Sequence, residues 1–127
     1  MTNRAVISTT DAPNAVGPYS QAVKVGNLVW ISGQIALHPK SNEMLDADVS
    51  CQARQAFNNL LEISKAAGGS ISDAVKINIS LVNIEDFDVV NKVMEEFFQP
   101  PYPARACVQV AALPKGASIE IEAILSI

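Results

Sequence analysis

Apolar and polar residues alternate along much of this chain, a pattern typical of strands that bury one face. Gly26-Asn27 stands between two of these stretches and suits the two-residue turn of a hairpin. The first stretch is short and suits the edge of a sheet. The predicted strands are 4–7, 21–25, 28–35, 73–82, 103–110 and 118–124.

Two other stretches place apolar residues at helical spacing. The first covers 49–67, with Asp48 suited to the N-cap and Gly68-Gly69 to the C-cap. The second begins at Asn83, carries acidic residues at its positive end, and is stopped by Pro100-Pro101. Both helices are expected to cover a sheet.

The order strand, strand, strand, helix, strand, helix, strand, strand predicts an α+β sandwich with both helices on one face of the sheet. We expect a single domain over 1–127. When the alternation is carried across the strands, the other face of the sheet is semi-polar and needs a partner, for which another subunit is the natural candidate. The residues predicted on that face are Trp30, Ser32, Gln34, Arg105, Cys107, Gln109, Glu120 and Glu122.

Composition adds two constraints. About half of the chain is hydrophobic (49%) and only 17% is charged, which is low for a soluble monomer and favours oligomerisation. The formal charge is -4, from 13 acidic and 9 basic residues, and Lys and Arg form no run. Nucleic acid is therefore disfavoured as the main partner, because phosphate binding needs clustered cations. A small anionic ligand still needs only one arginine.

The cellular setting is expected to be cytoplasmic. The first residues form no apolar signal-peptide segment, and no apolar run is long enough to span a bilayer. Cys51 and Cys107 are expected to be free thiols, because nothing in their spacing suggests a pair. His38 is the single histidine, so a multi-histidine metal site is excluded, and its loop position predicts a solvated side chain.

Arg105 lies in the middle of a short apolar strand, where burying it without an anionic partner is costly. It either neutralises a carboxylate within the protein, with Glu120 as the candidate, or binds one that arrives with a ligand. An arginine fork orients a carboxylate, and a nearby glutamate can orient or deprotonate water. Residue types alone favour a structural salt bridge over a site. Cys107 has no histidine nearby in the sequence to activate it as a nucleophile.

Two further features bear on a site. Gly33 interrupts a strand, which indicates either a bulge or a group that approaches the backbone closely. The aperiodic segment 8–19 predicts a long ordered loop, and such loops are often functional. The loop ends with Tyr19 beside a rigid turn.

Several separate motifs, in the same order and over nearly the whole chain, resemble the RidA family, also called YjgF or reactive intermediate imine deaminase. The motifs are Gly17-Pro18-Tyr19-Ser20-Gln21-Ala22, Ile31-Ser32-Gly33-Gln34-Ile35, Gln52-Ala53-Arg54-Gln55-Ala56-Phe57-Asn58-Asn59-Leu60, Pro103-Ala104-Arg105-Ala106-Cys107-Val108, Leu113-Pro114-Lys115 and Ile119-Glu120-Ile121-Glu122-Ala123.

The resemblance implies a chorismate-mutase-like (ferredoxin-like) fold with a six-stranded mixed sheet, assembled as a homotrimer with clefts between subunits. It implies hydrolysis of reactive 2-imino and enamine acids, such as 2-aminoacrylate and 2-iminobutanoate, to 2-keto acids and ammonia, without a cofactor. Pyridoxal-phosphate dehydratases release such compounds.

The resemblance also implies roles for individual residues. Arg105 matches the arginine that pairs with the substrate carboxylate, and Glu120 the acid that places the attacking water. Cys107 matches a position whose backbone contacts the substrate. Tyr19 and Ser32 match residues that line the cleft. Gly33 matches a glycine whose backbone approaches the ligand.

Two alternatives come with the fold: an endoribonuclease that inhibits translation, which the acidic composition disfavours, and a non-catalytic sensor of small acids. The link 98–103 is short and rich in proline compared with many relatives, so it is expected to reshape the cleft entrance.

Overall fold

The computed structural model describes residues 3–127, which form one six-stranded sheet and two α-helices in the predicted order βββαβαββ. The strands are β1 (Ala5–Ile7), β2 (Ala22–Val25), β3 (Leu28–Gln34), β4 (Ala74–Leu81), β5 (Ala104–Gln109) and β6 (Ile119–Ser126). The helices are α1 (Val49–Ala66) and α2 (Phe87–Phe97), with short 3₁₀ helices at Ile71–Asp73, Ile84–Asp86 and Pro114–Gly116.

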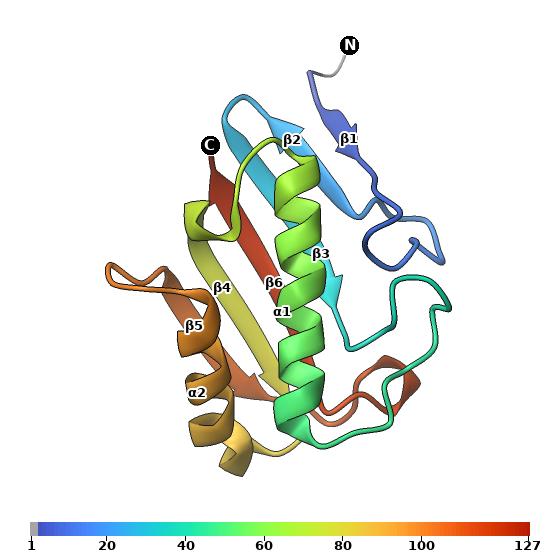
Figure 1. Ribbon diagram of the computed structural model, residues 1–127, viewed down its shortest axis with the longest axis vertical. Coiled ribbons are helices and arrows are strands. Elements are labelled where there is room, and N and C mark those ends of the chain that lie inside the picture. Colours follow the sequence, from blue (N-terminus) through green and yellow to red (C-terminus); the bar gives the residue numbers. More distant parts are fainter. Residues whose placement is uncertain (1–2) are drawn as a thin grey trace.

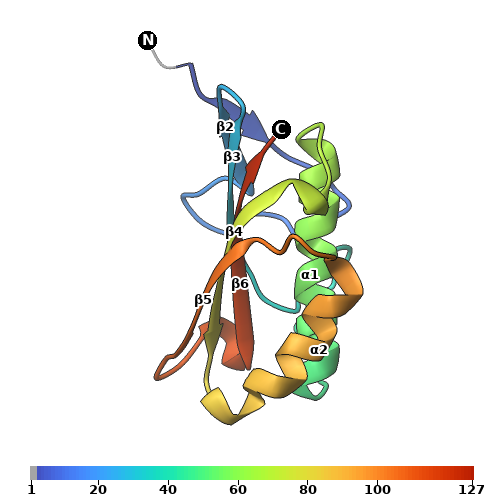
Figure 2. The same ribbon diagram turned by 90° about the vertical axis from the view of Figure 1, so that its left-hand side faces the viewer.

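The sheet is mixed, with the strand order β1-β2-β3-β6-β4-β5. Neighbouring strands are antiparallel except for β4 and β5, which α2 connects as a parallel crossover. Figure 1 shows both helices in front of the sheet, and the edge-on view in Figure 2 shows that they share one side of it. The predicted α+β sandwich is confirmed.

The ends of α1 follow the predicted chemistry. The Asp48 carboxylate accepts a hydrogen bond from the backbone N–H of Cys51 at 3.0 Å. Gly68, just past the C-cap residue Ala67, has φ of +91°, a conformation that favours glycine. The helix ends at Ala66, one residue earlier than predicted. Among residues 3–127, no helix has the length and apolarity needed to cross a bilayer.

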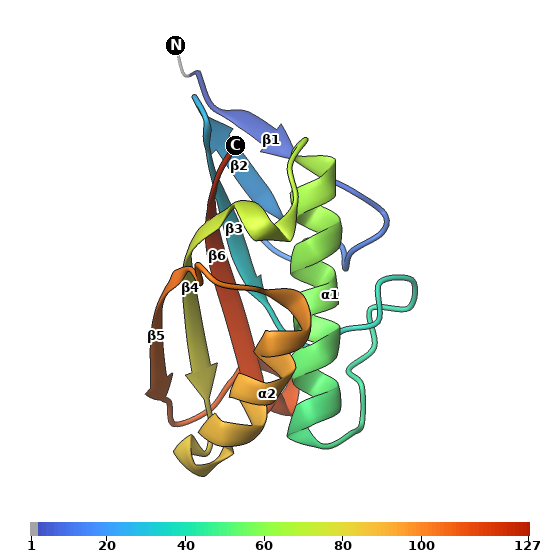
Figure 3. The same ribbon diagram turned by 60° about the vertical axis from the view of Figure 1, so that its left-hand side comes forward.

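The core lies between the helices and the sheet. Phe57 of α1 is fully buried, and its ring stacks on Phe97 at 5.2 Å and meets the edge of Phe98 at 5.9 Å between centroids. Figure 1 shows α1 in front of β3 and β6, in the middle of the sheet, and α2 in front of β4 and β5; the turned view in Figure 3 shows both helices on the same side of the sheet. These aromatic contacts join the two helices above the sheet.

Two predicted details of the elements are wrong. The second helix does not begin as α-helix at Asn83: Ile84–Asp86 is a 3₁₀ turn, in which the Asn83 side chain accepts from the Glu85 N–H, and α2 starts at Phe87. The apolar alternation Val75, Ile77, Ile79 and Leu81 within the predicted strand 73–82 predicts that Val75 faces the core. Val75 is instead 47% exposed, because the pairing of β4 with β6 shifts register between Ala74 and Lys76.

Candidate active site in two pockets

A β-bulge in β3 shapes the first pocket. Ile31 pairs with Ala123 of β6, but Gln34 pairs with Ile121, so β3 carries one extra residue between them. The extra residue reverses the alternation, and Gln34 turns to the helix side, where it is buried. Its side-chain amide donates to the carbonyl of Ser32 at 3.2 Å, across the bulge. The prediction that Gln34 lies on the uncovered face is wrong.

Both interpretations of Gly33 hold, since it lies in the bulge and another group approaches it closely. A Cβ at this position would lie 2.7 Å from Cδ and 2.9 Å from Oε1 of Glu120. Real Cβ contacts are longer than this, so only glycine leaves the Glu120 carboxyl where it is. The approaching group is therefore a side chain of the neighbouring strand β6.

Glu120 and Gly33 border a small cavity of about 110 Å³, here called the glutamate pocket. Tyr19 lines it from the 8–20 loop, and its hydroxyl accepts a hydrogen bond from the Val16 N–H at 3.3 Å. Ser32 lies just outside, with its hydroxyl donating to the Ser20 carbonyl at 2.6 Å. The other residues of the wall are Pro13, Asn14, Val16, Gln34, Ile35, Leu37, Pro114 and Lys115.

The setting of Glu120 changes its acidity. Burial raises the pKa of its carboxyl above the ordinary value of 4.5, and the negative charge of Glu122 on the same face of β6 raises it further. A carboxyl with a raised pKa is a stronger base when ionised and an available proton donor when protonated. Such a carboxyl has the properties of an acid-base group in a hydrolytic site.

Gly33→Ala should displace the Glu120 carboxyl without unfolding the protein. The atoms that meet the new Cβ belong to the end of a flexible side chain, so Glu120 swings away while the strands stay paired. If Glu120 acts as proposed below, we expect a loss of kcat on the order of 100-fold, the scale that a 1 Å misplacement can cause, measured by steady-state kinetics with a thermal melt. Gly17→Ala, at another glycine of this region, is the control, because its Cβ would meet only Tyr19 ring carbons at 3.5 Å. Full activity in Gly33→Ala would contradict a role for Glu120.

Arg105 lies on the opposite side of the sheet from Glu120. In the parallel pairing of β5 with β4 it stands opposite Ile77, which is fully buried against the helices. Paired residues in adjacent strands point to the same face. The prediction that the set Arg105, Cys107 and Gln109 shares the uncovered face with Glu120 is therefore wrong. That face of β5 carries Ala104, Ala106 and Val108, all exposed.

Neutral groups of α2 hold the guanidinium of Arg105. Its Nη1 donates to Oδ1 of Asn91 and lies 3.7 Å from Sδ of Met94, and its Cζ is 5.0 Å from the centre of the Phe87 ring. The ion pairs among residues 3–127 join other side chains, Arg54 with Glu96 and Lys65 with Glu62. Within the described chain Arg105 thus has a polar partner but no carboxylate in contact.

The Arg105 side chain faces a second cavity, of about 440 Å³, here called the arginine pocket. Its lining combines α2 with the proline-rich link before β5: Asn91, Met94, Glu95, Tyr102, Pro103 and Arg105. Asn91 is not among the site residues predicted from the sequence. The spacing could have identified it, because Phe87, Asn91 and Met94 are four and three residues apart and therefore share one face of the helix.

Cys107 lies one alternation beyond Arg105 and packs against the core. Burial raises the pKa of its thiol, and the nearby positive charge of Arg105 only partly opposes this. The thiol is therefore protonated near neutral pH, unlike an activated nucleophile. Cys107 and Cys51 are both free, as predicted.

Other predicted features lie away from both pockets. His38 is exposed in its turn, as predicted, with Nδ1 accepting from the Lys40 N–H at 3.3 Å. Among residues 3–127, no three His, Cys, Asp or Glu side chains gather closely enough to hold a metal ion. The predicted residues Arg105 and Glu120 lie instead in the arginine pocket and the glutamate pocket.

The fold and the two pockets place the chain in a class of small α+β proteins with many solved members. RidA from the Antarctic bacterium Psychrobacter sp. PAMC 21119 superposes with a TM-score of 0.94 at 54% identity, over 97% of this chain and 99% of that one. TdcF of E. coli, solved with bound serine, superposes with a TM-score of 0.92 at 44% identity, over 97% and 98%.

The sequence comparisons agree. The family model described as Endoribonuclease L-PSP matches residues 9–127. A 2-iminobutanoate/2-iminopropanoate deaminase of Dermatophagoides farinae is 50% identical over 127 residues, covering 100% of this chain and 99% of the relative. The Homo sapiens protein of the same name is 50% identical over 121 residues, covering 95% and 88%. This chain belongs to that family, the RidA/YjgF family.

Proposed function

We propose that this protein hydrolyses reactive 2-imino acids, 2-iminobutanoate and 2-iminopropanoate among them, to 2-keto acids and ammonia. Relatives that are 50% identical over nearly the whole chain carry the name of this activity. The observation that carries the proposal is the Arg105 guanidinium, which neutral partners hold at a cavity. A carboxylate-bearing ligand of small size fits that environment.

The reaction adds water across a C=N bond. The water oxygen bonds to the imine carbon and one water proton reaches nitrogen, which gives a carbinolamine. Its hydroxyl proton is then transferred to nitrogen, the C–N bond breaks, and ammonia leaves as the ketone forms. An enamine such as 2-aminoacrylate first takes a proton on its terminal carbon and becomes the imine. Since imines already hydrolyse in water, the protein needs only to orient the substrate, place the water and move protons.

Arg105 binds the substrate carboxylate as a fork, and its contacts with Asn91 and Phe87 keep the guanidinium oriented in the free protein. Glu120 accepts a proton from the attacking water and returns one to nitrogen. The part of the site that holds the attacking water is lined by Tyr19, Ser32 and the Gly33 backbone. Cys107 contributes backbone, because β5 is an edge strand whose outer N–H and C=O groups can meet a ligand.

We also propose that the protein assembles as a homotrimer whose clefts each join the arginine pocket of one copy to the glutamate pocket of the next. Arg105 and Glu120 lie on opposite faces of their own sheet, so a single copy does not offer both to one small acid. The uncovered face includes exposed Trp30 and Val108, apolar side chains that association would bury. Light scattering after size exclusion measures the mass directly.

Activity should fall on acidification through the raised pKa of Glu120. Its ionised form accepts the water proton, so the acid limb of the kcat–pH profile should lie above 4.5. Glu122→Gln should move that limb to lower pH, because it removes the second cause of the raised pKa. Stopped-flow rates over a pH series measure the acid limb of the wild type and that of the variant. An acid limb at or below 4.5 in the wild type would assign the base to another group.

The test of the function is a dehydratase-coupled assay. A pyridoxal-phosphate dehydratase generates 2-aminoacrylate from serine or 2-iminobutanoate from threonine, and lactate dehydrogenase reports keto-acid release. The protein should speed release without changing substrate consumption by the dehydratase. Rates equal to those of buffer, with both precursors, would reject the activity.

The family model's name, Endoribonuclease L-PSP, keeps RNA cleavage as a second candidate. The net charge of -4 and the absence of a Lys or Arg run in the sequence disfavour it. Strongly salt-dependent RNA cleavage that a defined point variant abolishes would revive it. Tight binding of 2-keto acids without imine turnover would instead indicate a sensor.

We propose a cytoplasmic location. Two free thiols, of which Cys51 is exposed, support it, because such thiols persist in reducing compartments. Fluorescence microscopy of a tagged chain in its own host tests this.

A further inference from the structure

We propose that three buried carboxamides, Gln21, Gln52 and Asn59, are positioning residues of the glutamate pocket. Each bonds to the backbone of a pocket wall or of the segment directly before Glu120. They act on Glu120 and Tyr19 through the backbone and touch no substrate. The expected effect on kcat rests on the proposed function. The expected effects on hydrogen exchange and on the Glu120 pKa rest on the geometry of the pocket.

Gln21 holds the 8–20 loop. Its side-chain amide donates to the carbonyls of Pro13 at 2.7 Å and Thr9 at 3.0 Å, and its carbonyl accepts from the Thr9 N–H at 2.7 Å. The residue is 4% exposed and directly precedes β2. The loop, which supplies Tyr19, has no strand or helix of its own. The side-chain bonds of Gln21 therefore fix its backbone in place of secondary-structure hydrogen bonds.

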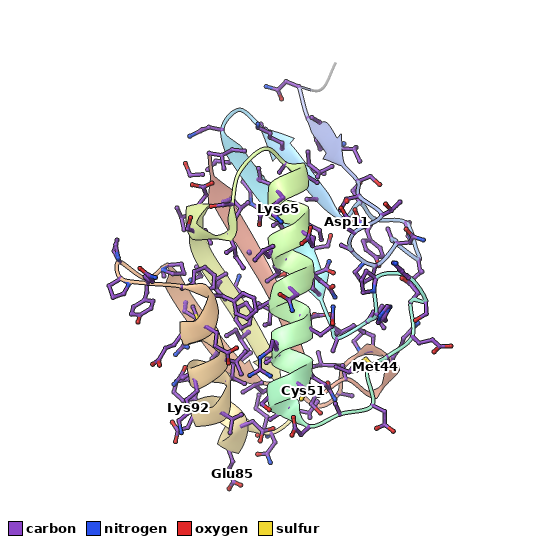
Figure 4. All side chains as sticks on the ribbon, in the orientation of Figure 1. Asp11, Met44, Cys51, Lys65, Glu85 and Lys92 are labelled. Atoms are coloured by element: carbon purple, nitrogen blue, oxygen red, sulfur yellow. The ribbon has the colours of Figure 1, made fainter. Side chains whose placement is uncertain are left out.

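Asn59 holds the wall that follows β3. Its amide donates to the carbonyls of Ile35 at 3.3 Å and Leu37 at 3.1 Å, and its own carbonyl accepts from Gln55 at 2.9 Å. Ile35 and Leu37 belong to the pocket wall and, with Ala117, to a small second apolar cluster against which Met44 and Leu113 pack. Figure 4 shows Met44 in the loop that leads to α1.

Gln52 holds the segment before Glu120. Its carbonyl accepts from the Ser118 N–H at 2.9 Å, and its amide donates to the Ala47 carbonyl at 3.0 Å. Ser118 lies two residues before Glu120 and just after the Pro114–Gly116 turn that forms another wall. Gln52 and Asn59 are seven residues apart on α1, so they share one face of a rigid helix.

The distribution of buried polar side chains sets these carboxamides apart. Among residues 3–127 the buried polar side chains are Gln21, Gln34, Gln52, Asn59 and Ser64. All four carboxamides bond to backbone around the glutamate pocket, whereas Ser64 donates to the Leu60 carbonyl within its own helix at 2.7 Å. Burying an amide is costly unless its bonds are made, so such a cluster specifies the geometry of what it binds.

The first experiment needs no variant. Amide hydrogen exchange followed by NMR should show that the N–H groups of Thr9 and Ser118, which lie outside the strands, are protected by at least about 100-fold over an open loop. The matched reference is the Lys40 N–H in an exposed turn, whose acceptor is the exposed His38 ring. Exchange of Thr9 and Ser118 at the rate of Lys40 would overturn the proposal.

The second experiment replaces each carboxamide by an apolar side chain of similar size: Gln21→Met, Gln52→Met and Asn59→Leu. Looser walls admit water, so the Glu120 pKa, measured by carboxyl carbon NMR, should fall toward its ordinary value, and kcat should drop roughly 10- to 100-fold while KM changes less. The other titratable groups at the pocket are Tyr19, Lys115 and, beside it on β6, Glu122; following their signals keeps their changes separate.

Ser64→Ala is the control, because it removes a buried hydrogen bond from α1 that touches no wall. It should lower stability and leave the Glu120 pKa and kcat unchanged. Folded variants of all three carboxamides with wild-type Glu120 pKa and kcat would overturn the proposal. If the wild type has no deaminase activity, the proposed function fails, but the hydrogen exchange and the Glu120 pKa still decide whether these residues position the pocket.

Discussion

Arg105→Met should reduce kcat/KM for 2-imino acids by roughly 100-fold or more, because each charge-assisted hydrogen bond to a carboxylate contributes about 1.5–3 kcal/mol. The protein should still fold, since among residues 3–127 no ion pair includes Arg105 and Met is an unbranched apolar side chain that keeps much of the arginine stem. Dehydratase-coupled kinetics and a denaturant melt measure the two effects.

Two further variants sharpen this result. Arg105→Lys keeps the charge but loses the two-pronged guanidinium, so its activity should lie between that of the wild type and that of Arg105→Met. Arg54→Met is the matched control: it breaks the bidentate pair with Glu96, at 2.9 and 2.7 Å, between exposed side chains of α1 and α2. It should cost at most about 1 kcal/mol of stability and no activity. Undiminished turnover in Arg105→Met would remove Arg105 from the substrate site.

Glu120→Gln should lower kcat by about 100- to 10,000-fold, the usual contribution of a general acid or base. Glutamine has the same shape beside Gly33 but cannot accept the proton of the attacking water. KM should change little, because the substrate carboxylate is proposed to bind at the arginine pocket. Glu122→Gln, on the same face of β6 where its carboxylate accepts from Asn78 at 3.1 Å, is the control: it should move the acid limb but leave kcat on the pH-independent plateau unchanged.

The stability of Glu120→Gln should depend on pH in a defined direction. Burial raises the folded-state pKa of Glu120, so the wild type loses stability as pH rises through that pKa. The substitution removes this loss. The variant should therefore be more stable than the wild type at neutral pH, with the difference vanishing below the ordinary pKa. Urea melts at several pH values check this, and a variant less stable at neutral pH would indicate that the carboxylate makes a stabilising contact.

A mixture of the Arg105→Met and Glu120→Gln variants tests the proposed cleft between subunits of a homotrimer. When Arg105→Met and Glu120→Gln chains are unfolded and refolded together, random trimers should regain about a quarter of the wild-type sites, because a cleft then finds Arg105 on one chain and Glu120 on the next. Each variant refolded alone should stay inactive. No recovery from well-folded mixed trimers would mean that both residues act within one copy, or that they do not act together.

Much of the fold could be predicted because local rules and tertiary packing agree. Alternation and helical spacing identified all six strands and both α-helices, and Asp48 and Gly68 mark the ends of α1 by their own chemistry. Glu120 and Glu122 fall on the uncovered face as expected, because fully buried Ile119 and Ile121 leave only one orientation for β6. Family motifs added candidate residues that spacing alone did not distinguish from salt-bridge partners.

The errors have a common cause, which is that alternation identifies two faces without saying which is covered. In β5 the side with Ala104 and Val108 is the more apolar, yet it is the uncovered one. The crossover through α2 turns Arg105 toward Asn91 instead. In β3 one extra residue at the bulge moved Gln34 from one face to the other. Neither the covered face of β5 nor the bulge in β3 can be predicted from the spacing of apolar residues within the strand.

The sequence by itself therefore determined the elements, their order, the family and the identity of the candidate residues. These follow from local backbone preferences and from motifs contiguous in the chain. Only the tertiary structure decided that Arg105 and Glu120 lie on opposite faces of one sheet, in separate pockets. It also decided that Gly33 makes room for Glu120 and that buried carboxamides tie the walls of the glutamate pocket. Those facts depend on strand register and on contacts between residues far apart in the sequence, which no local pattern records.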